Sequence, residues 1–438
     1  MINIDGTPFV WLTFQEDGQM NNKIKALNAL RDARINAQAT DILIMAHGWK
    51  NEQQQALALY RRIWQHTRPY LNSSRKFVLV GIAWPSVAFP KDFDEQATIS
   101  SGGASSVSAA PPPDDLDLES FRIILDEALP GDENARLREL AEQAADEKSS
   151  DASSAAKSAM AAEFVRVMRY LTSQADPELA EEGKQMATAV SEHPDILFHV
   201  TNEPFIPDSD AIGGAVGATG VGKIFDGPRA TMARLASQFT YYPMKIRAGN
   251  VGHQLGAQLD PQSFLDGARI HLLGHSFGAR LVAACALQMQ ARQLQSLILL
   301  QGAFSHNGLA EQSPGGRGYF ADVVKGKRVR GPIVITHTHN DRACTFFYAL
   351  ASKLSGDGAR AIGGRNDRFG SMGGNGALHV ATVDYGSFPT GSSNKPVAGK
   401  VNNYLADKVI VKIPGGIDAH NNIGTTGMGA LIGAALSA

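Results

Sequence analysis

The sequence predicts an α/β fold with a mostly parallel central sheet of about eight strands and helices on both of its faces. Two observations lead to this prediction. Short apolar runs rich in Val, Ile and Leu recur along the chain, as is typical of strands that are covered on both faces. Segments of helical character lie between most of these runs, which is the alternation expected of parallel βα units.

The strands are predicted, in chain order, at Phe9–Phe14, Ile42–Ala46, Phe77–Ala83, Ile270–Leu273, Leu297–Leu300, Ile333–His337, Leu378–Val383 and Val409–Ile413. Helices of the same core are predicted at Glu52–Thr67, Arg229–Phe239, Ala279–Arg292 and Thr345–Lys353. The apolar stretch Thr425–Ala438 is too short to cross a bilayer, and we expect it to pack as a terminal helix.

The amino-acid composition of the sequence changes after the third predicted strand. A Ser/Gly-rich stretch and Pro111–Pro113 lead into a segment rich in Ala and Glu. Helices are predicted in that segment at Leu118–Leu129, Glu133–Glu147 and Ala155–Leu171. Because the sheet pattern resumes afterwards, residues 86–202 are predicted as a helical insertion into one domain formed by residues 1–85 and 203–438. Its length exceeds that of an ordinary loop, which favours a cap or lid over a peripheral decoration.

Composition argues against several classes of protein. The formal net charge of −2 offers no electrostatic basis for binding nucleic acid or an anionic membrane. No apolar run approaches the ~20 residues that span a bilayer, and the N-terminus does not resemble a secretory signal, so a cytoplasmic location is expected. The two cysteines, Cys285 and Cys344, do not predict a disulfide framework. The oligomeric state stays open.

The most informative motif is Gly274-His275-Ser276-Phe277-Gly278, a G-x-S-x-G pattern between a predicted strand and a predicted helix. This context is that of a nucleophile elbow, in which a strained turn exposes the serine hydroxyl. Side chains at the two glycine positions are expected to collide with the neighbouring helix and strand. The alternative is an ordinary strand-to-helix turn with a capping serine.

A serine nucleophile needs a base to accept its proton and a carboxylate to orient that base. The chain offers these residues after strands in the order Ser, acid, His, with Asp341 following Ile333–His337 and His420 lying beyond the last predicted strand. Asp341 is favoured as the acid. Asp384, which follows a later strand, and Asp418, which is close to His420, are the alternatives.

Three other histidines fit a catalytic role less well. His337 and His339 lie too close to the strand of the proposed acid for this role, and a period of two places both on one face of the sheet. They do not come with the Cys, His or carboxylate partners that a metal site needs, so no metal is predicted. His379 is expected to begin a strand and to be structural.

An oxyanion hole needs two backbone amides. One is expected from Phe277, directly after the serine, and the other from the loop that follows an earlier strand. His47-Gly48-Trp49 is that loop, with Trp49 as the donor, Gly48 allowing the turn and His47 holding the loop by a hydrogen bond. His47, Gly48 and Trp84 are the predicted substrate-binding residues. The alternative is an ordinary turn with a packed tryptophan.

With these residues the chain resembles the α/β-hydrolase superfamily of serine esterases and lipases, over most of its length outside the insertion. The resemblance implies an α/β-hydrolase fold with Ser276 as the nucleophile, His420 as the general base and acid, and Asp341 as its orienter. It also implies that Trp49 and Phe277 supply the oxyanion amides and that no cofactor is needed.

The reaction expected from this resemblance is hydrolysis of a carboxylic ester, from a small molecule or a lipid, through an acyl-enzyme. The chain departs from the family in the long stretch between Ala83 and Ile270, where one helix is usual. A phospholipase-type toxin directed at membranes, an amidase or peptidase, and a non-catalytic interaction protein with this fold are the alternatives.

Overall fold

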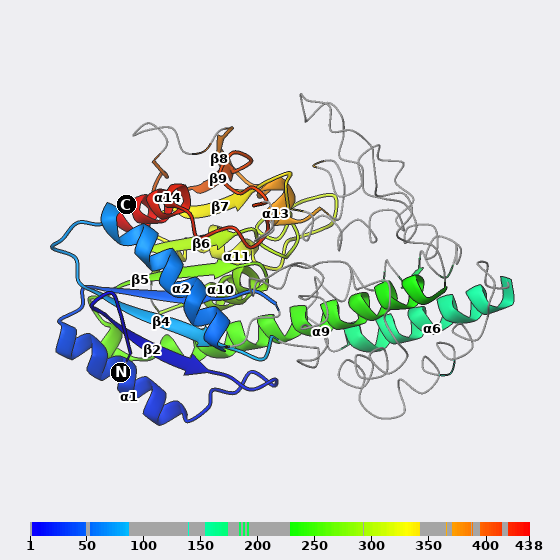
Figure 1. The fold of residues 1–438 in the computed structure, drawn as a ribbon, viewed down its shortest axis with the longest axis horizontal. Helices are drawn as coiled ribbons and strands as arrows, with labels where there is room; N and C mark the ends of the chain where they lie inside the picture. The colour runs from blue at the N-terminus through cyan, green and yellow to red at the C-terminus, as the bar shows by residue number, and fades with distance from the viewer. Residues whose placement is uncertain are drawn as a thin grey trace.

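A computed structural model describes residues 2–49, 53–86, 154–173, 228–291, 293–341, 370–386, 395–413 and 419–438, with isolated positions 139, 184, 187, 188, 191, 365 and 388. The described residues form one nine-stranded sheet in the order β1-β2-β4-β3-β5-β6-β7-β9-β8. Only β1 runs antiparallel to its neighbour. The predicted α/β architecture with a mostly parallel sheet is therefore confirmed (Figure 1).

The strands are β1 (Ile2–Ile4), β2 (Thr7–Thr13), β3 (Asp41–Ala46), β4 (Phe77–Ala83), β5 (Arg269–His275), β6 (Ser296–Leu300), β7 (Ile333–His337), β8 (Thr382–Tyr385) and β9 (Val401–Leu405). The α-helices are α1 (Lys23–Ala37), α2 (Gln53–Thr67), α6 (Ser154–Ser173), α9 (Pro228–Leu259), α10 (Phe277–Gln288), α11 (Ala321–Lys325), α13 (Met372–Asn375) and α14 (Thr426–Ser437). Single 3₁₀ turns follow α2 (η1, Arg68–Tyr70) and α9 (η4, Ser263–Leu265).

The strands divide their side chains between two apolar layers. In β3, Ile42 and Ile44 join the layer formed with α1, α9 and α10, whereas Leu43 and Met45 join the layer formed with α2 and α14. All six residues of β3 are buried. The continuous apolar runs seen in the sequence follow from this arrangement, because a strand that is covered on both faces has no solvent-facing side.

The first six predicted strands coincide with β2 to β7, apart from shifts of a few residues at their ends. The last two predictions are less accurate. The seventh strand begins at Thr382 rather than at Leu378, and Val409–Ile413, predicted as the eighth, contains no strand. The sheet instead uses Val401–Leu405 as β9.

The misplaced strand has a physical explanation in two asparagines. Asn402 and Asn403 interrupt the apolar pattern of β9, yet both are buried. Their amides are satisfied by backbone groups, since Asn402 Nδ2 donates to the Ile333 carbonyl at 3.2 Å and Asn403 Nδ2 donates to the Ala377 carbonyl at 3.0 Å. Tertiary hydrogen bonds thus allow polar residues in a covered strand, which an apolar pattern does not predict.

Helix α9 is much longer than the predicted helix Arg229–Phe239. A proline usually interrupts a helix, yet α9 continues through Pro243. The residues after the proline pack against α10, and Ala248, Val251 and Leu255 are fully buried. Tertiary packing therefore outweighs the local preference for a break. The predicted helix Thr345–Lys353 lies outside the described residues.

The chain leaves the sheet at the carboxyl end of β4 and returns to it through α9. Helix α6 matches the predicted helix Ala155–Leu171, whereas nearly all of Leu118–Leu129 and Glu133–Glu147 lies outside the described residues. Figure 1 shows α6 and the first half of α9 side by side beyond the end of the sheet. The insertion thus departs from the edge of the sheet where the carboxyl ends of the parallel strands lie.

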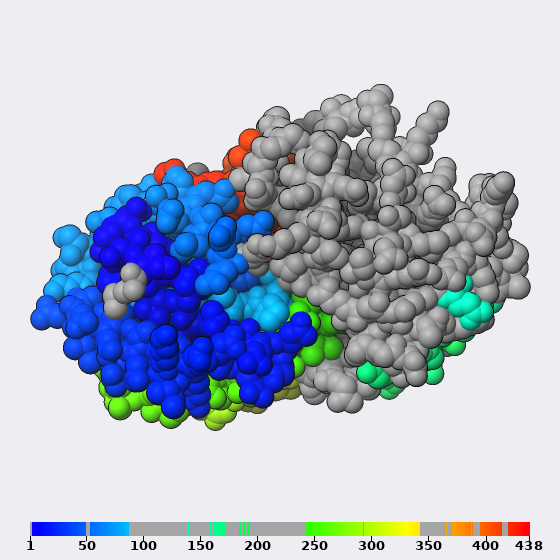
Figure 2. Space-filling model, turned by 60° about the horizontal axis from the view of Figure 1, so that its bottom comes forward, coloured from blue at the N-terminus to red at the C-terminus, as the bar shows by residue number. Residues whose placement is uncertain are grey.

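The C-terminal stretch forms the expected terminal helix, α14. Its Met428, Leu431, Ile432 and Leu436 side chains are buried, and the helix packs against α2. In the space-filling view, residues from the start of the chain, in blue, form a broad continuous surface, and residues near its end, in red, border that surface (Figure 2). No helix within the described residues has the length and apolarity needed to cross a membrane.

Candidate active site

Ser276 stands at the turn between β5 and α10 with φ 57° and ψ −122°. A positive φ is strained for any residue with a side chain and persists only where surrounding contacts enforce it. Here the Ser276 N–H donates to the Leu300 carbonyl at 3.0 Å, and the Ser276 carbonyl accepts from Ala303 N–H at 3.1 Å. Hydrogen bonds to β6 and to the loop after it therefore hold the strained turn.

The two glycines of the motif allow this turn to pack. A Cβ at Gly274 would lie 2.2 Å from the carbonyl oxygen of Gly278 at the start of α10. A Cβ at Gly278 would lie 2.2 Å from the carbonyl oxygen of Ala46 at the end of β3. Both distances are much shorter than van der Waals contact. A side chain at either glycine would therefore collide with the neighbouring backbone, as predicted from the sequence.

The turn lies at the point where the strand order reverses. The next strand after β3 along the chain, β4, lies on one side of β3, whereas β5 and β6 lie on the other side. Open parallel sheets bind ligands outside the carboxyl ends of their strands at such a switch point. Gly48, after β3, meets Ser276 there, since a Cβ on Gly48 would lie 2.7 Å from Ser276 Cβ.

His47 and Trp84 support the loop that carries Gly48. The His47 Nδ1–H donates to the Gly48 carbonyl at 2.9 Å, and the Trp84 indole N–H donates to the His47 carbonyl at 3.1 Å. The two rings stack with centroids 5.7 Å apart. Burial lowers the pKa of His47 to about 4, so the ring is neutral at pH 7. Contact of these two side chains with a substrate stays a prediction.

The bond made by His47 also sets the direction of the next amide. In a trans peptide the N–H points away from the carbonyl of the same unit. Because His47 holds the Gly48 carbonyl, the amide N–H of Trp49 is directed to the opposite side. The Trp49 ring lies 6.0 Å from the Phe277 ring, so the two predicted oxyanion residues are neighbours.

His420 and Asp341 form a buried pair. Asp341 follows β7 and is fully buried, and His420 lies in the turn that precedes α14. His420 Nδ1 is 2.7 Å from Asp341 Oδ2. Asp384, the alternative acid, is exposed on β8 and accepts instead from Asn403 Nδ2 at 2.9 Å. Asp418 lies outside the described residues.

A residue that was not among the sequence candidates joins this pair to the serine. His275, directly before Ser276, is buried and donates from Nε2 to the backbone carbonyl of His420 at 2.9 Å. The two imidazole rings lie 4.8 Å apart. Burial, assisted by the nearby His420, lowers the pKa of His275 to about 3, so it is a neutral donor. His275 occupies a variable position of the motif, which gave no signal in the sequence.

Gln301 is a second polar residue that the sequence did not indicate. It follows β6 directly and is fully buried. Its side-chain Nε2 donates to Asp341 Oδ2 at 3.1 Å, the same oxygen that faces His420. No motif or spacing rule marks a single glutamine after a strand, although its position at a strand end is the signal that also marked Asp341.

The three other histidines considered in the sequence do not join this pair. His337 is buried in β7, and His339 Nδ1 lies 2.8 Å from Asp407 Oδ2 near the surface. His379 does not begin a strand, and its Nδ1 lies 2.8 Å from Asn307 Oδ1. Within the described part of the chain, no three or more His, Cys, Asp or Glu side chains are arranged to hold a metal ion.

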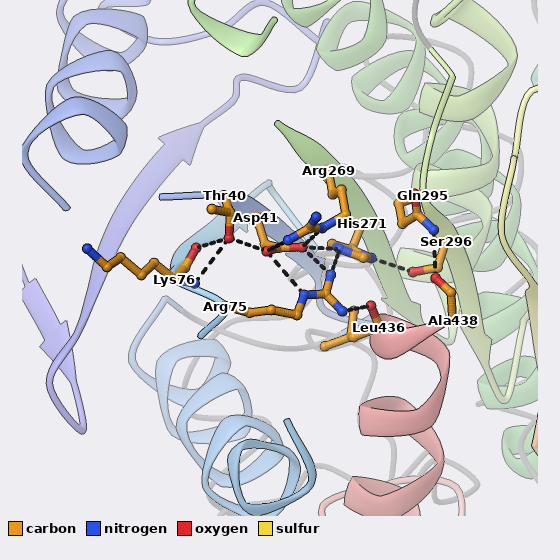
Figure 3. Close-up of polar contacts among 10 residues, drawn as sticks. All are labelled: Thr40, Asp41, Arg75, Lys76, Arg269, His271, Gln295, Ser296, Leu436 and Ala438. Carbon is orange, nitrogen blue, oxygen red and sulfur yellow. Dashed lines mark hydrogen bonds and ion pairs between the residues drawn. The ribbon is translucent and has the colours of Figure 1, made fainter. Parts of the chain in front are cut away.

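A second buried polar cluster lies at the opposite, amino edge of the sheet (Figure 3). Asp41, at the start of β3, pairs with Arg75 and Arg269 and accepts from His271 Nε2 at 3.1 Å. Arg75 also donates to the Leu436 carbonyl in α14. This cluster joins the ends of β3 and β5 and the terminal helix, and it lies at the other end of these strands from Ser276.

Comparison of the chain with protein-family models, with curated proteins and with solved structures found no match.

Proposed function

We propose that this protein is a serine hydrolase of the α/β-hydrolase fold that cleaves a carboxylic ester through an acyl-enzyme on Ser276. The observation that carries the proposal is the convergence of a strained serine turn and a His–Asp pair. Ser276 has φ 57°, His420 lies 2.7 Å from Asp341, and the residue beside the serine binds the His420 backbone. The order along the chain is Ser, Asp, His, each after a strand, as in that fold.

The proposed reaction begins when Ser276 Oγ attacks the ester carbonyl carbon and His420 Nε2 accepts the hydroxyl proton. Asp341 holds the Nδ1–H tautomer of His420 and offsets the charge of the imidazolium. His420 then gives the proton to the departing alcohol oxygen as the C–O bond breaks. His420 then takes a proton from water as the water oxygen attacks the acyl-enzyme carbonyl carbon, and it returns this proton to Ser276 Oγ as the bond between Oγ and the acyl carbon breaks and the carboxylic acid leaves.

The amides of Trp49 and Phe277 are the proposed donors to the tetrahedral oxyanion. Phe277 begins α10, so its amide lies at the N-terminal end of the helix, where the helix dipole is positive. The Trp49 amide is aimed by the bond between His47 and the Gly48 carbonyl. Donors that are fixed before the reaction stabilise the developing charge without reorganisation.

The position of the insertion supports the proposal that it forms a cap over the active site. It leaves the sheet at the carboxyl end of β4, which is the edge that holds Ser276. By contrast, the apolar residues of α14 are buried against the core, so a membrane-directed role that uses this tail has no support in the fold. Hydrolysis rates on a series of p-nitrophenyl esters of increasing acyl-chain length will identify the preferred acyl chain.

Labelling with a fluorophosphonate probe tests the nucleophile. We expect the folded protein to be labelled at Ser276, and Ser276→Ala to lose both labelling and hydrolysis of a short p-nitrophenyl ester with a melting temperature near that of the wild type. Ser296→Ala is the matched control, because Ser296 is also buried beside a histidine, 2.8 Å from His271 Nδ1, but at the opposite edge of the sheet.

Two results would contradict the proposal. Hydrolysis that persists in Ser276→Ala would exclude Ser276 as the nucleophile. A folded wild-type protein that is neither labelled nor active on any ester of the series would favour a non-catalytic interaction protein. An amide panel run in parallel separates an esterase from an amidase.

A further inference from the structure

Gln301 occupies a backbone position that suits glycine better. It lies directly after β6, between the strand that ends at the serine turn and the strand that precedes Asp341. Its φ is 48°, in the left-handed region that glycine adopts without strain. A strained residue with a fully buried polar side chain indicates that the side chain itself is required there.

The orientation of the Gln301 amide is fixed by its partners. The Gln301 backbone N–H donates to Thr336 Oγ1 at 3.3 Å, and that hydroxyl donates its own proton to Gln301 Oε1 at 3.0 Å. Nε2 then faces Asp341 Oδ2 at 3.1 Å and the Gly373 carbonyl at 3.2 Å. A flipped amide would place its oxygen against two acceptors, so only one orientation satisfies the network.

Two donors therefore converge on one oxygen of Asp341. His420 Nδ1 is 2.7 Å from Oδ2, and Gln301 Nε2 is 3.1 Å from the same atom. The terminal torsion of a carboxylate has a broad energy profile, so a second donor to the same oxygen restricts the plane of the carboxylate. We infer that Gln301 is a positioning residue that holds Asp341 Oδ2 in line with the Nδ1–H of His420.

This inference rests on the proposed function, because it assigns Gln301 a place in the same Ser–His–Asp chemistry. An amide suits the task because it carries no charge and no proton that it can lose. Small displacements within such an arrangement lower turnover strongly, by roughly 10²-fold for about 1 Å. Loss of the Gln301 donor is thus expected to act on kcat, since the Gln301 amide donates to the proposed catalytic acid.

Two variants test the inference, so that the test does not depend on the correct folding of one variant alone. Gln301→Met keeps the length and removes the amide, whereas Gln301→Gly removes the side chain but suits the positive φ. We expect each to lower kcat on a p-nitrophenyl ester about 10- to 100-fold, by analogy with the range for residues that orient metal ligands, with KM within about twofold. Gln38→Gly is the matched control, since Gln38 has φ 50° at the end of α1, and its kcat should equal that of the wild type.

A double-mutant cycle separates positioning from a general structural effect. In an Asp341→Asn background, Gln301→Met should lower kcat by less than about twofold, because the carboxylate that Gln301 orients is gone. Equal losses in both backgrounds would overturn the inference. So would a kcat within twofold of wild type in both Gln301→Met and Gln301→Gly.

A proton resonance provides a readout that does not depend on catalysis. The Nδ1 proton of His420, hydrogen-bonded to a carboxylate, should give a far-downfield signal that is assigned by its loss in His420→Gln. We expect Gln301→Met to shift or broaden it and Gln38→Gly to leave it in place. If the wild type is inactive but Gln301→Met still moves the signal, the proposed function fails and the placement of Asp341 by Gln301 stands. An unchanged signal overturns the placement itself.

Discussion

Two buried histidines, both neutral, hold the backbone loops of the candidate site. His47 donates to the Gly48 carbonyl and His275 donates to the His420 carbonyl, so each imidazole fixes one loop of the site. Burial lowers their pKa values to about 4 and about 3. Near pH 7 both rings are therefore uncharged, and each keeps its proton on the nitrogen that faces a carbonyl.

The pairing of His420 identifies the acid to be tested. Asp341→Asn should lower kcat on a p-nitrophenyl ester by about 10⁴-fold, because an amide holds the wrong imidazole tautomer and cannot offset the imidazolium. The kcat of Asp384→Asn should stay within about twofold of the wild-type value, since Asp384 accepts a hydrogen bond from Asn403 and not from His420. Steady-state kinetics of the two variants measure this, and the reverse pattern would show that Asp384 is the acid.

The structural elements are joined at the amino edge by a buried ionic cluster. Burial alone would raise the pKa of Asp41, but hydrogen bonds from His271, Arg269 and Arg75 hold it well below its usual range. The carboxylate is thus ionised and surrounded by donors from β5 and from the loop before β4 (Figure 3). Because Arg75 also binds the Leu436 carbonyl, the same cluster fixes the end of α14.

Removal of this carboxylate should destabilise the fold and leave the chemistry intact. Asp41→Asn leaves Arg75, whose side chain is only 12% exposed, without its buried counter-ion, and breaking such a pair typically costs about 3–5 kcal/mol of unfolding free energy. Urea unfolding measures the loss, and kcat at 25 °C should be unchanged, because the cluster lies at the far edge from Ser276. Asp32→Asn is the control, since its partner Arg31 is 45% exposed, and its effect should stay below about 1 kcal/mol. If Asp41→Asn also lost less than about 1 kcal/mol of unfolding free energy, the stabilising role of the Asp41 carboxylate would be contradicted.

For the molecule as a whole, the buried histidines set the response to acid. The pKa of His47, His275 and His337 is lowered by burial to about 4, 3 and 4, and that of His271 is lowered as well. His339 beside Asp407 has a raised pKa and acts in the opposite sense. Between about pH 6.5 and pH 4 the four histidines with lowered pKa values therefore bind more protons in the unfolded state than in the folded state.

Stability should consequently fall as pH decreases through this window. Each histidine with a lowered pKa contributes about 1.4 kcal/mol of lost unfolding free energy per pH unit between its unfolded and folded pKa values. Urea unfolding at pH 7, 6 and 5 checks this, and His337→Gln, which removes one such group, should reduce the slope by that amount. An unfolding free energy that is constant or rises from pH 7 to pH 5 would refute the expectation.

Much of the fold and the site could be predicted because the signals are local. An apolar run followed by glycine and a helix marks a strand, a turn and a strand-end residue within about ten positions, and this located Ser276, Gly48 and the segments of β2 to β7. Asn402 and Asn403 concealed β9, and Pro243 concealed the second half of α9, because distant backbone groups and α10 supply what the local sequence lacks.

Which polar side chains meet is decided only when distant segments fold together. His420 meets Asp341 across 79 positions, Gln301 meets Asp341 across 40, and His275 meets the His420 carbonyl across 145. The amino-acid sequence specifies the sheet edge and the kinds of residue that arrive there, because backbone conformation and burial of apolar runs are governed by near neighbours. Hydrogen bonds require the distances between atoms of different loops to be right within a few tenths of an ångström, and only the assembled sheet sets those distances.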